Sequence, residues 1–368
     1  MRKLAVMAAS SLVAALALFG SVSPAQAAPV ADTPIPTIGG NIFVSTSADG
    51  KITAGYSGTT GLSIYNSTTE SVMSYTALSL GMTSVGEAVV SPDGSTVYIL
   101  GDTPQVVAVF DVSTASVTST ILLPFSAWMG AITPDGSTLL VYAKSTQEIL
   151  KIDLGTSTVS APLFMGFDYP YQLCVTSDSS TIYLPGYDAG YTSIVDIASL
   201  TETGQLIDTD GPLNCVLDAH DTLYIGDYDS GAVRKYASDG SNTVSASGLV
   251  QEMFGMGLTC NSVILGDYQN TGYVTLDRTS LATTGSITSP VYTYMMTVDA
   301  AASMTWVGGY DAATGLQRIT ETACPEVGPT PLPNTGIDNT LVTSTIAFAS
   351  ALVLVGGVAL LIRRRRAN

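Results

Sequence analysis

Residues 87–100 have the sequence EAVVSPDGSTVYIL, and residues 130–141 repeat it as GAITPDGSTLLV. In each copy an apolar segment with alternating side chains precedes Pro-Asp-Gly, which favours a tight turn, and a second apolar segment follows. Weaker copies place their first turns near Asp49, Asp178, Asp218, Cys260 and Asp299, at successive spacings of 44, 42, 43, 40, 42 and 39 residues. A period of 40 to 45 residues with four short strands per unit predicts an all-β fold, a seven-bladed β-propeller with four-stranded blades.

The two clearest units resemble the YVTN family of propeller repeats. SPDGSTVYIL is followed by VAVFDVSTASV, and TPDGSTLLVY is followed by ILKIDLGTSTV. The resemblance covers about residues 41 to 320. It implies the same propeller architecture and assigns no function.

The seventh unit shows only three strands, at Met295 to Val298, Met304 to Val307 and Leu316 to Ile319. The segment from Val30 to Ile38 precedes the first unit, and we expect it to supply the missing outer strand. Such closure of the ring removes an exposed sheet edge.

The C-terminal part carries a second pattern. Leu332-Pro333-Asn334-Thr335-Gly336 precedes an apolar run from Leu341 to Ile362, which as a helix would rise about 33 Å and cross a membrane, and a basic tail at residues 363–368. This order resembles the LPXTG sorting signal of Gram-positive surface proteins. The resemblance implies that a sortase cuts after Thr335 and joins Thr335 to peptidoglycan, so the membrane holds the chain only before sorting. The alternative is a plain single-span membrane protein.

The N-terminal part agrees with export. Arg2 and Lys3 precede an apolar stretch, and Ala25-Gln26-Ala27 fits a cleavage site, so residues 1–27 read as a signal peptide. We expect a propeller over residues 28–323, a Pro-rich tether over 324–331, and a protein secreted and attached to the Gram-positive cell wall.

Charge limits the partners of the mature chain. Removing Arg2, Lys3 and the four tail arginines leaves 7 of the 13 basic residues, and removing Asp338 leaves 29 of the 30 acidic ones, a net charge of about −22. That balance argues against nucleic acid and anionic lipid as direct partners. It fits a cationic partner or solubility alone.

The predicted topology separates two sets of loops. Turns between first and second strands lie on the face from which the chain leaves the ring. Turns between second and third strands, and connections between blades, lie on the opposite face, which would point away from the wall. The connections include Phe254 and Met256 beside the ligand candidates. From that outer face we select as ligand-binding candidates Trp128, Phe167, Asp168, Tyr169, Tyr171, Tyr187, Asp227, Tyr228, Asp267, Tyr268, Tyr292, Tyr294 and Tyr310.

Aromatic side chains interspersed with carboxylates suit a sugar or an apolar or cationic side chain. The plainer interpretation is that Gly and Asp serve hairpin turns and that tyrosines cover strand ends. Asp227-Tyr228-Asp229-Ser230-Gly231 lacks the spaced ligands of a known calcium loop. We predict no metal and no cofactor.

Four cysteines in an exported chain favour disulfides. Cys260 and Cys324 should both lie on the exit face of adjacent blades, which would leave Cys174 to pair with Cys215. Four cysteines allow three connectivities, and the sequence does not choose among them.

An enzyme is the less favoured class. His220, the one histidine, falls in a first-to-second turn, which leaves little for a Ser/His/Asp triad. A carboxylate pair among Asp168, Asp227 and Asp267 remains open. The sequence therefore favours a non-enzymatic surface protein that presents a propeller for binding or adhesion to a glycan, host protein or wall component; a lactonase-, lyase- or glycosidase-like enzyme and a coat or pilus-associated subunit are the alternatives.

Overall fold

The computed structural model describes residues 28–40, 42–58, 60–167, 170–207, 211–237 and 240–321. Contacts divide the chain into two units, Met1–Pro325 and Glu326–Asn368. The signal peptide, the tether, the sorting motif, the apolar run of residues 341–362 and the basic tail lie outside the described residues. Within the described part, no helix is long and apolar enough to cross a membrane.

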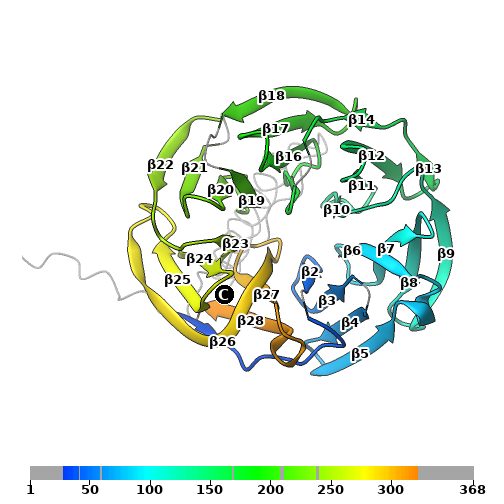
Figure 1. Ribbon diagram of the computed structural model, residues 1–368, viewed down its shortest axis with the longest axis horizontal. Coiled ribbons are helices and arrows are strands. Elements are labelled where there is room, and N and C mark those ends of the chain that lie inside the picture. Colours follow the sequence, from blue (N-terminus) through cyan, green and yellow to red (C-terminus); the bar gives the residue numbers. More distant parts are fainter. Residues whose placement is uncertain are drawn as a thin grey trace, which may run out of the picture. The chain divides into compact units, whose positions relative to one another are not determined.

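The described part is a seven-bladed β-propeller, as predicted (Figure 1). Blades 1 and 2 are regular four-stranded sheets, read from the central axis outward. Blade 1 contains β2 (Phe43–Thr46), β3 (Ile52–Ser57), β4 (Gly61–Asn66) and β5 (Ser71–Thr76). A short 3-10 helix η2 (Leu78–Leu80) leads to blade 2, with β6 (Ser84–Val90), β7 (Thr96–Thr103), β8 (Val106–Asp111) and β9 (Ser116–Leu122).

Blade 3 has a divided outer strand. It contains β10 (Met129–Ile132), β11 (Thr138–Ala143) and β12 (Glu148–Asp153), and both β13 (Thr158–Val159) and β14 (Leu163–Phe164) pair with β12. Pro162 lies between the two short strands, and because proline has no N–H to donate, it interrupts the ladder at this outer edge.

Blades 4 and 5 return to the regular plan. Blade 4 contains β15 (Cys174–Val175), β16 (Thr181–Gly186), β17 (Tyr191–Asp196) and β18 (Thr201–Ile207). Blade 5 contains β19 (Pro212–Leu217), β20 (Leu223–Asp227), β21 (Val233–Tyr236) and β22 (Asn242–Ala246).

Blades 6 and 7 share one strand. Blade 6 contains β23 (Met253–Leu258), β24 (Ser262–Asp267), β25 (Thr271–Asp277) and the first part of β26 (Thr283–Val298). The last part of β26 is the inner strand of blade 7, followed by β27 (Met304–Gly309), the 3-10 helix η3 (Ala312–Thr314) and β28 (Leu316–Glu321). The expectation that Tyr292 and Tyr294 lie in a loop between blades is therefore wrong, because both belong to this continuous strand.

The ring closes as expected, with an N-terminal strand on the last blade. β1 (Pro29–Ala31) pairs antiparallel with β28, and Ile35 forms a further bridge with Leu316. Asp32 pairs with Arg318 at 2.6 Å between carboxylate and guanidinium. The outer strand of blade 7 therefore comes from the opposite end of the described chain.

The repeated motif makes the same turn in blades 1 to 4. In blade 2 the Ser91 hydroxyl donates to the Asp93 carboxylate at 2.6 Å, and the backbone N–H of Ser95 donates to the same carboxylate at 3.0 Å. Gly94 follows at φ +71°, a left-handed conformation that suits glycine. Equivalent bonds join Ser47 to Asp49, Thr133 to Asp135 and Thr176 to Asp178.

The end of β28 fixes the polarity of the ring. The Glu321 carboxylate accepts bonds from the Thr259 hydroxyl at 2.8 Å and from the Asn261 N–H at 3.0 Å, both in the first-to-second turn of blade 6. The described chain thus ends on the face that carries the first-to-second turns, which we call the exit face. The loops of the candidate site lie on the opposite face.

Candidate functional site at one mouth of the propeller

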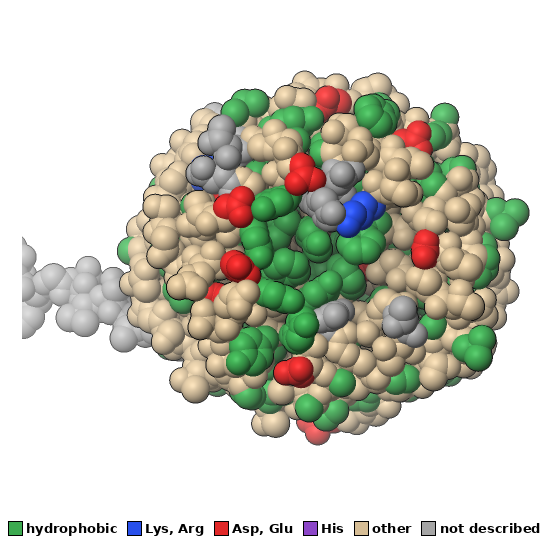
Figure 2. Space-filling view, viewed as in Figure 1, with side chains coloured by type: hydrophobic (Ala, Val, Ile, Leu, Met, Phe, Trp, Pro, Cys, Tyr) green, Lys and Arg blue, Asp and Glu red, His purple; other side chains and the backbone are tan. Residues whose placement is uncertain are grey.

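Aromatic side chains from several blades meet at the centre of the face opposite the exit face. Figure 2 shows hydrophobic side chains filling the hollowed centre of the face turned to the viewer, with acidic side chains spaced around it. We call the following residues the aromatic cluster: Phe43, Trp128, Tyr171, Tyr187, Tyr228, Phe254, Tyr268, Tyr294 and Tyr310.

The inner part of the cluster crosses the axis of the ring. The Phe43 ring at the start of β2 packs edge-on against Trp128 at 5.8 Å and Tyr294 at 5.1 Å between ring centroids. Trp128 contacts Tyr171 at 6.2 Å, and Tyr171 contacts Phe254 at 5.2 Å. Offset and edge-to-face pairs at these distances are favourable beyond the area they bury. Phe254 also meets Tyr294 at 5.4 Å, so the inner rings form a closed circuit.

The outer part of the cluster comes from hairpins between second and third strands of blades 4 to 7. Tyr228 contacts both Tyr187 and Phe254 at 5.8 Å, and Tyr268 contacts Phe254 at 5.1 Å and Tyr310 at 5.5 Å. Tyr310 is exposed, whereas the other three tyrosines of the cluster hairpins are half-buried. This part of the cluster therefore faces solvent on one side of the mouth.

Carboxylates engage the tyrosine hydroxyls at the rim. The Tyr187 hydroxyl donates to Asp229 at 3.1 Å. Burial, together with a hydrogen bond to Glu252, raises the pKa of Tyr228, and the Gln269 amide also donates to Glu252 at 2.9 Å. Burial and the neighbouring Tyr310 raise the pKa of Tyr268. These phenols therefore stay protonated and serve as donors at neutral pH.

A lysine side chain lies against the inner cluster. The Lys144 ammonium, from the hairpin between β11 and β12, is 5.0 Å from the centroid of the Trp128 ring. A cation over an indole face at this distance is attracted by the ring quadrupole. The Trp128 Nε1–H is buried and has no hydrogen-bond acceptor among the described residues.

Most of the predicted aromatic candidates meet in the cluster, but Phe167 and Tyr292 do not. Phe167 is buried, stacks on Tyr142 at 5.9 Å with an interplanar angle of 13°, and packs edge-on against Tyr191. It is a core residue beneath the mouth. Tyr292 is 38% exposed and makes none of the ring contacts that define the cluster. Asp168 and Tyr169 lie outside the described residues.

The two remaining acidic candidates serve their own hairpins. Asp227 is fully buried and pairs with Arg234. Asp267 is nearly buried and accepts N–H bonds from Gln269 at 2.7 Å and Asn270 at 3.2 Å, within the turn that follows it. Each carboxylate therefore holds the loop that carries a cluster tyrosine, Tyr228 or Tyr268.

Phe43 was missed from the sequence, and Phe254 was noted in a connection but not chosen as a candidate. A positional signal exists for both. Phe43 stands six residues before the first turn of its unit at Asp49, and Phe254 stands six before Cys260; Trp128 and Tyr171 stand seven before Asp135 and Asp178. An aromatic residue at this point enters the inner strand of its blade beside the axis.

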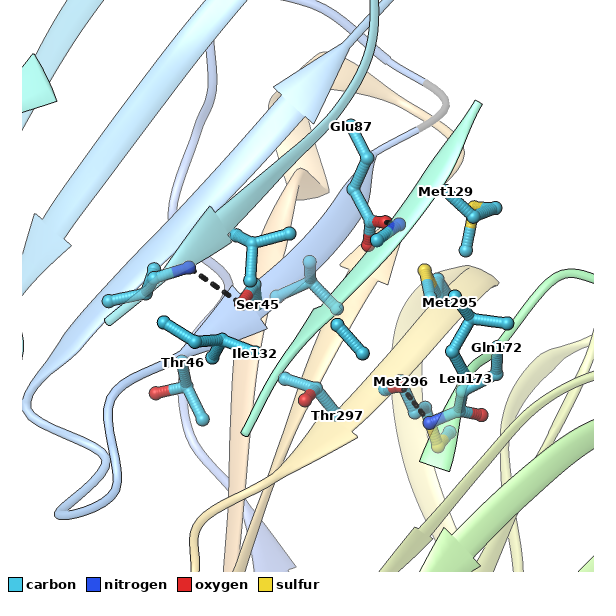
Figure 3. Close-up of a pocket in the computed structure, with 15 residues that line it drawn as sticks. Ser45, Thr46, Glu87, Met129, Ile132, Gln172, Leu173, Met295, Met296 and Thr297 are labelled. Atoms are coloured by element: carbon cyan, nitrogen blue, oxygen red, sulfur yellow. Dashed lines mark hydrogen bonds between the residues drawn. The ribbon is translucent and has the colours of Figure 1, made fainter. Parts of the chain in front are cut away.

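Beneath the cluster lies a cavity of about 150 Å³ along the axis, between the inner strands (Figure 3). Its lining includes Glu87 of β6, Met129 of β10, Gln172 before β15, and Met295 of β26. The Glu87 carboxylate accepts the Gly130 N–H at 2.7 Å, and burial raises its pKa to about 8. Gln172 donates to the Met296 carbonyl at 3.1 Å, while its buried Oε1 accepts no bond from the described residues. Neither Glu87 nor Gln172 was selected from the sequence.

The other sequence candidates lie elsewhere. His220 is exposed in the first-to-second turn of blade 5, on the exit face. Among the described residues no group of His, Cys, Asp and Glu side chains could hold a metal ion.

The cysteines follow one predicted pairing. Cys174 and Cys215 form a disulfide with 6.1 Å between Cα atoms, which joins the inner strands of blades 4 and 5. Cys260 is also disulfide-bonded. Its expected partner, Cys324, lies outside the described residues.

The fold and the cluster define a class: a seven-bladed propeller with an aromatic mouth on the face opposite its chain exit. No protein-family model and no curated protein sequence matches this chain. Its structure resembles 1759 solved chains, so the fold is too widely shared to assign a function. One of them, the Kuenenia stuttgartiensis hydrazine synthase, aligns with a TM-score of 0.63 over 83% of this chain and 100% of that chain, at 14% identity. That protein is an enzyme, but at this identity the likeness shows the fold alone.

Proposed function

We propose that this chain is a non-enzymatic surface protein, exported, attached to a Gram-positive cell wall through Thr335, and bound to an extracellular ligand through its aromatic cluster. The observation that carries the binding role is the convergence at one mouth of rings from separate blades. The YVTN-like repeats supply the scaffold, and the LPXTG-like pattern with its sortase supplies the attachment.

The polarity of the ring supports display. The described chain ends at Glu321 on the exit face, eleven positions before Leu332 begins the sorting pattern. Attachment beyond that end would hold the exit face toward the wall. The aromatic mouth would then be directed outward, where a glycan, a host protein or another cell can reach it.

Binding is favoured over catalysis by how the acidic residues are used. Asp227 is paired with Arg234, and Asp267 caps its own hairpin. Both carboxylates are thereby committed to loop structure, which disfavours the acid–base pair that a glycosidase needs. The hydrazine synthase likeness adds no catalytic residue, because it rests on fold.

One experiment tests attachment and binding together. Cells producing the full chain are compared with cells carrying Thr335→Ala or Trp128→Ala, on a glycan and host-matrix array. We expect Thr335→Ala to shed the protein to medium or membrane, because the sortase would no longer cut after residue 335, form the thioester intermediate and pass the chain to the wall amine. Trp128→Ala should remain attached to the wall but lose array binding.

Two results would contradict the proposal. Unchanged covalent wall attachment of Thr335→Ala would exclude sorting at this residue. Wall-attached, folded protein that binds nothing on the array would exclude a glycan or host-matrix ligand, and extensive lateral association of the chains would then favour a coat subunit.

A further inference from the structure

We infer that the aromatic cluster binds a cationic, amphipathic peptide segment, whose lysine or arginine enters the mouth beside apolar side chains. This inference rests on the proposed binding function and names the chemistry of the ligand. It is carried by the charge around the cluster and by the placement of Lys144.

The protein already shows a cation on this surface. The Lys144 ammonium lies over Trp128 at 5.0 Å from the ring centroid, at the edge of the inner rings. Phe254 presents a second ring near the centre, in contact with Tyr171, Tyr228, Tyr268 and Tyr294. An ammonium or guanidinium group that reaches the face of such a ring is attracted by the ring quadrupole.

The rim carries negative charge that this cation would meet. Asp188, Asp229 and Asp311 are exposed in the cluster hairpins, and Glu252 is half-buried beside Tyr228. Because the tyrosine hydroxyls donate to Asp229 and Glu252, these carboxylates stay fixed at the edge of the rings. They retain acceptor capacity for a charged donor, since an ionised carboxylate has about four lone-pair sites.

Basic side chains do not balance this rim. In the part of the chain that the structure describes, Lys144 is the one basic residue in the loops of this face. Arg234 starts nearby in β21, but its side chain is 17% exposed and pairs with Asp227 beneath the hairpin. The mouth is therefore apolar at its centre and acidic at its edge, which complements a segment with alternating cationic and apolar residues. A neutral sugar would use the rings but not the charge.

The test uses two peptides of one shape. The first is a nine-residue peptide of alternating lysine and leucine, and the second is the same peptide with every lysine Nε-acetylated. Each is titrated into the full chain, purified in a non-ionic detergent. The intrinsic fluorescence reports the site, because Trp306 is fully buried in blade 7 and Trp128 lies in the cluster.

We expect the lysine peptide to bind with an affinity that falls as salt rises. The acetylated peptide should bind at least about tenfold more weakly. Phe254→Leu keeps apolar bulk but removes the ring, and Glu252→Gln keeps an acceptor but removes the charge. Each should weaken binding of the lysine peptide about fivefold or more. Glu70→Gln removes an exposed carboxylate from the turn between β4 and β5, on the exit face, and should leave binding unchanged.

The outcomes separate the two proposals. Equal binding of the two peptides, or equal loss in Glu70→Gln and Glu252→Gln, would overturn the cationic ligand. If neither peptide binds while a neutral glycan on the array binds and is lost in Phe254→Leu, the ligand class falls and the binding function stands. Cooperative unfolding shows that the purified chain is folded. If such a chain binds neither peptide and nothing on the array, both proposals are wrong.

Discussion

In blades 1 to 4 the aspartate of each first-to-second turn accepts a hydroxyl from its own turn, whereas Asp218 of blade 5 pairs with an arginine of the next blade and blade 6 has Cys260 in place of the aspartate. Asp49, Asp93, Asp135 and Asp178 each accept a Ser or Thr hydroxyl two residues earlier. In blade 5, Asp218 pairs instead with Arg278 of blade 6 at 3.0 Å. In blade 6, the turn at Thr259 and Asn261 donates to Glu321 of blade 7.

The seven turns differ in how much of the local motif each one keeps. Asp218 and Asp299 still accept bonds within their own turns, and the contacts with the next blade add to these in blades 5 and 6. The turn of blade 4 likewise donates to Asp221 of blade 5. The outer tyrosines of the cluster belong to blades 4 to 7, the side on which the repeat departs most. The outer rings of the aromatic cluster thus come from the blades that keep least of the repeat, whereas its inner rings also come from blades 1 and 3.

The largest expected effect comes from breaking a pair between blades. Arg278→Met should lower the free energy of unfolding by about 3 kcal/mol or more, because Asp218 is then buried without its cation. Arg278 and Asp218 are 15% and 9% exposed, and Arg278 also donates to the Thr259 carbonyl at 3.0 Å. Urea unfolding at pH 7 measures the loss.

Lys51→Met is the matched control in the other half of the ring. Lys51 pairs with Asp49 at 2.8 Å, but the two side chains are 60% and 52% exposed, so the loss should stay below about 1 kcal/mol. Equal losses in the two variants would show that blades 5 to 7 do not depend on their charges more than blades 1 to 4.

Glu87 is a buried acid in blade 2 whose carboxylate accepts a backbone N–H of blade 3 and has no cation as its partner in that contact. Burial raises its pKa from 4.5 to about 8. The unfolded chain ionises above about pH 4.5 while the folded chain stays protonated to about 8, so the wild type loses stability as pH rises across this window.

Glu87→Gln removes that loss. We expect it to stabilise the protein by about 3 kcal/mol at pH 7 and by almost nothing below pH 4.5, since Gln resembles the protonated acid. Urea unfolding of both proteins at pH 4.5, 7 and 8.5 measures the difference. If the free energies of unfolding of the two proteins differ by the same amount at all three pH values, Glu87 ionises with an ordinary pKa in the folded protein.

The parts of the fold that follow from local chemistry could be predicted. Pro92-Asp93-Gly94 determines a turn by its own hydrogen bonds, and the period of such turns sets the number of blades. The missing fourth strand of blade 7 pointed to the N-terminal segment, because the ring must close. Pro162 and the unbroken β26 were not foreseen, since the division or joining of outer strands depends on pairing with neighbours.

The candidate site was predictable in composition but not in contacts. The loop positions of Trp128 and Tyr228 followed from topology. The contact of Phe43 with Tyr294 joins residues about 250 positions apart and depends on how blades 1 and 7 are rotated about the axis. Phe167 shows the opposite case. Its position in the sequence predicts a loop residue at the mouth, but its ring packs in the core on Tyr142.

The smallest effect tests whether the turns of blades 1 to 4 are self-sufficient. Asp93→Ala removes the acceptor of the Ser91 hydroxyl and of the Ser95 N–H, and should cost about 1 kcal/mol in the free energy of unfolding at pH 7. Hydrogen bonds, first that from Ser91, hold the pKa of Asp93 below its usual 3.8. Its contribution is therefore present above about pH 4 and is lost as pH falls through the lower folded value.

The deficit of Asp93→Ala should accordingly shrink between pH 4 and pH 2, measured by urea unfolding beside the wild type. Asp188→Ala, at an exposed position in a hairpin of the aromatic mouth, should leave stability unchanged at both pH values. If Asp188→Ala costs as much as Asp93→Ala, the carboxylates of the mouth are structural like those of the turns. They would then be less available to a cationic ligand.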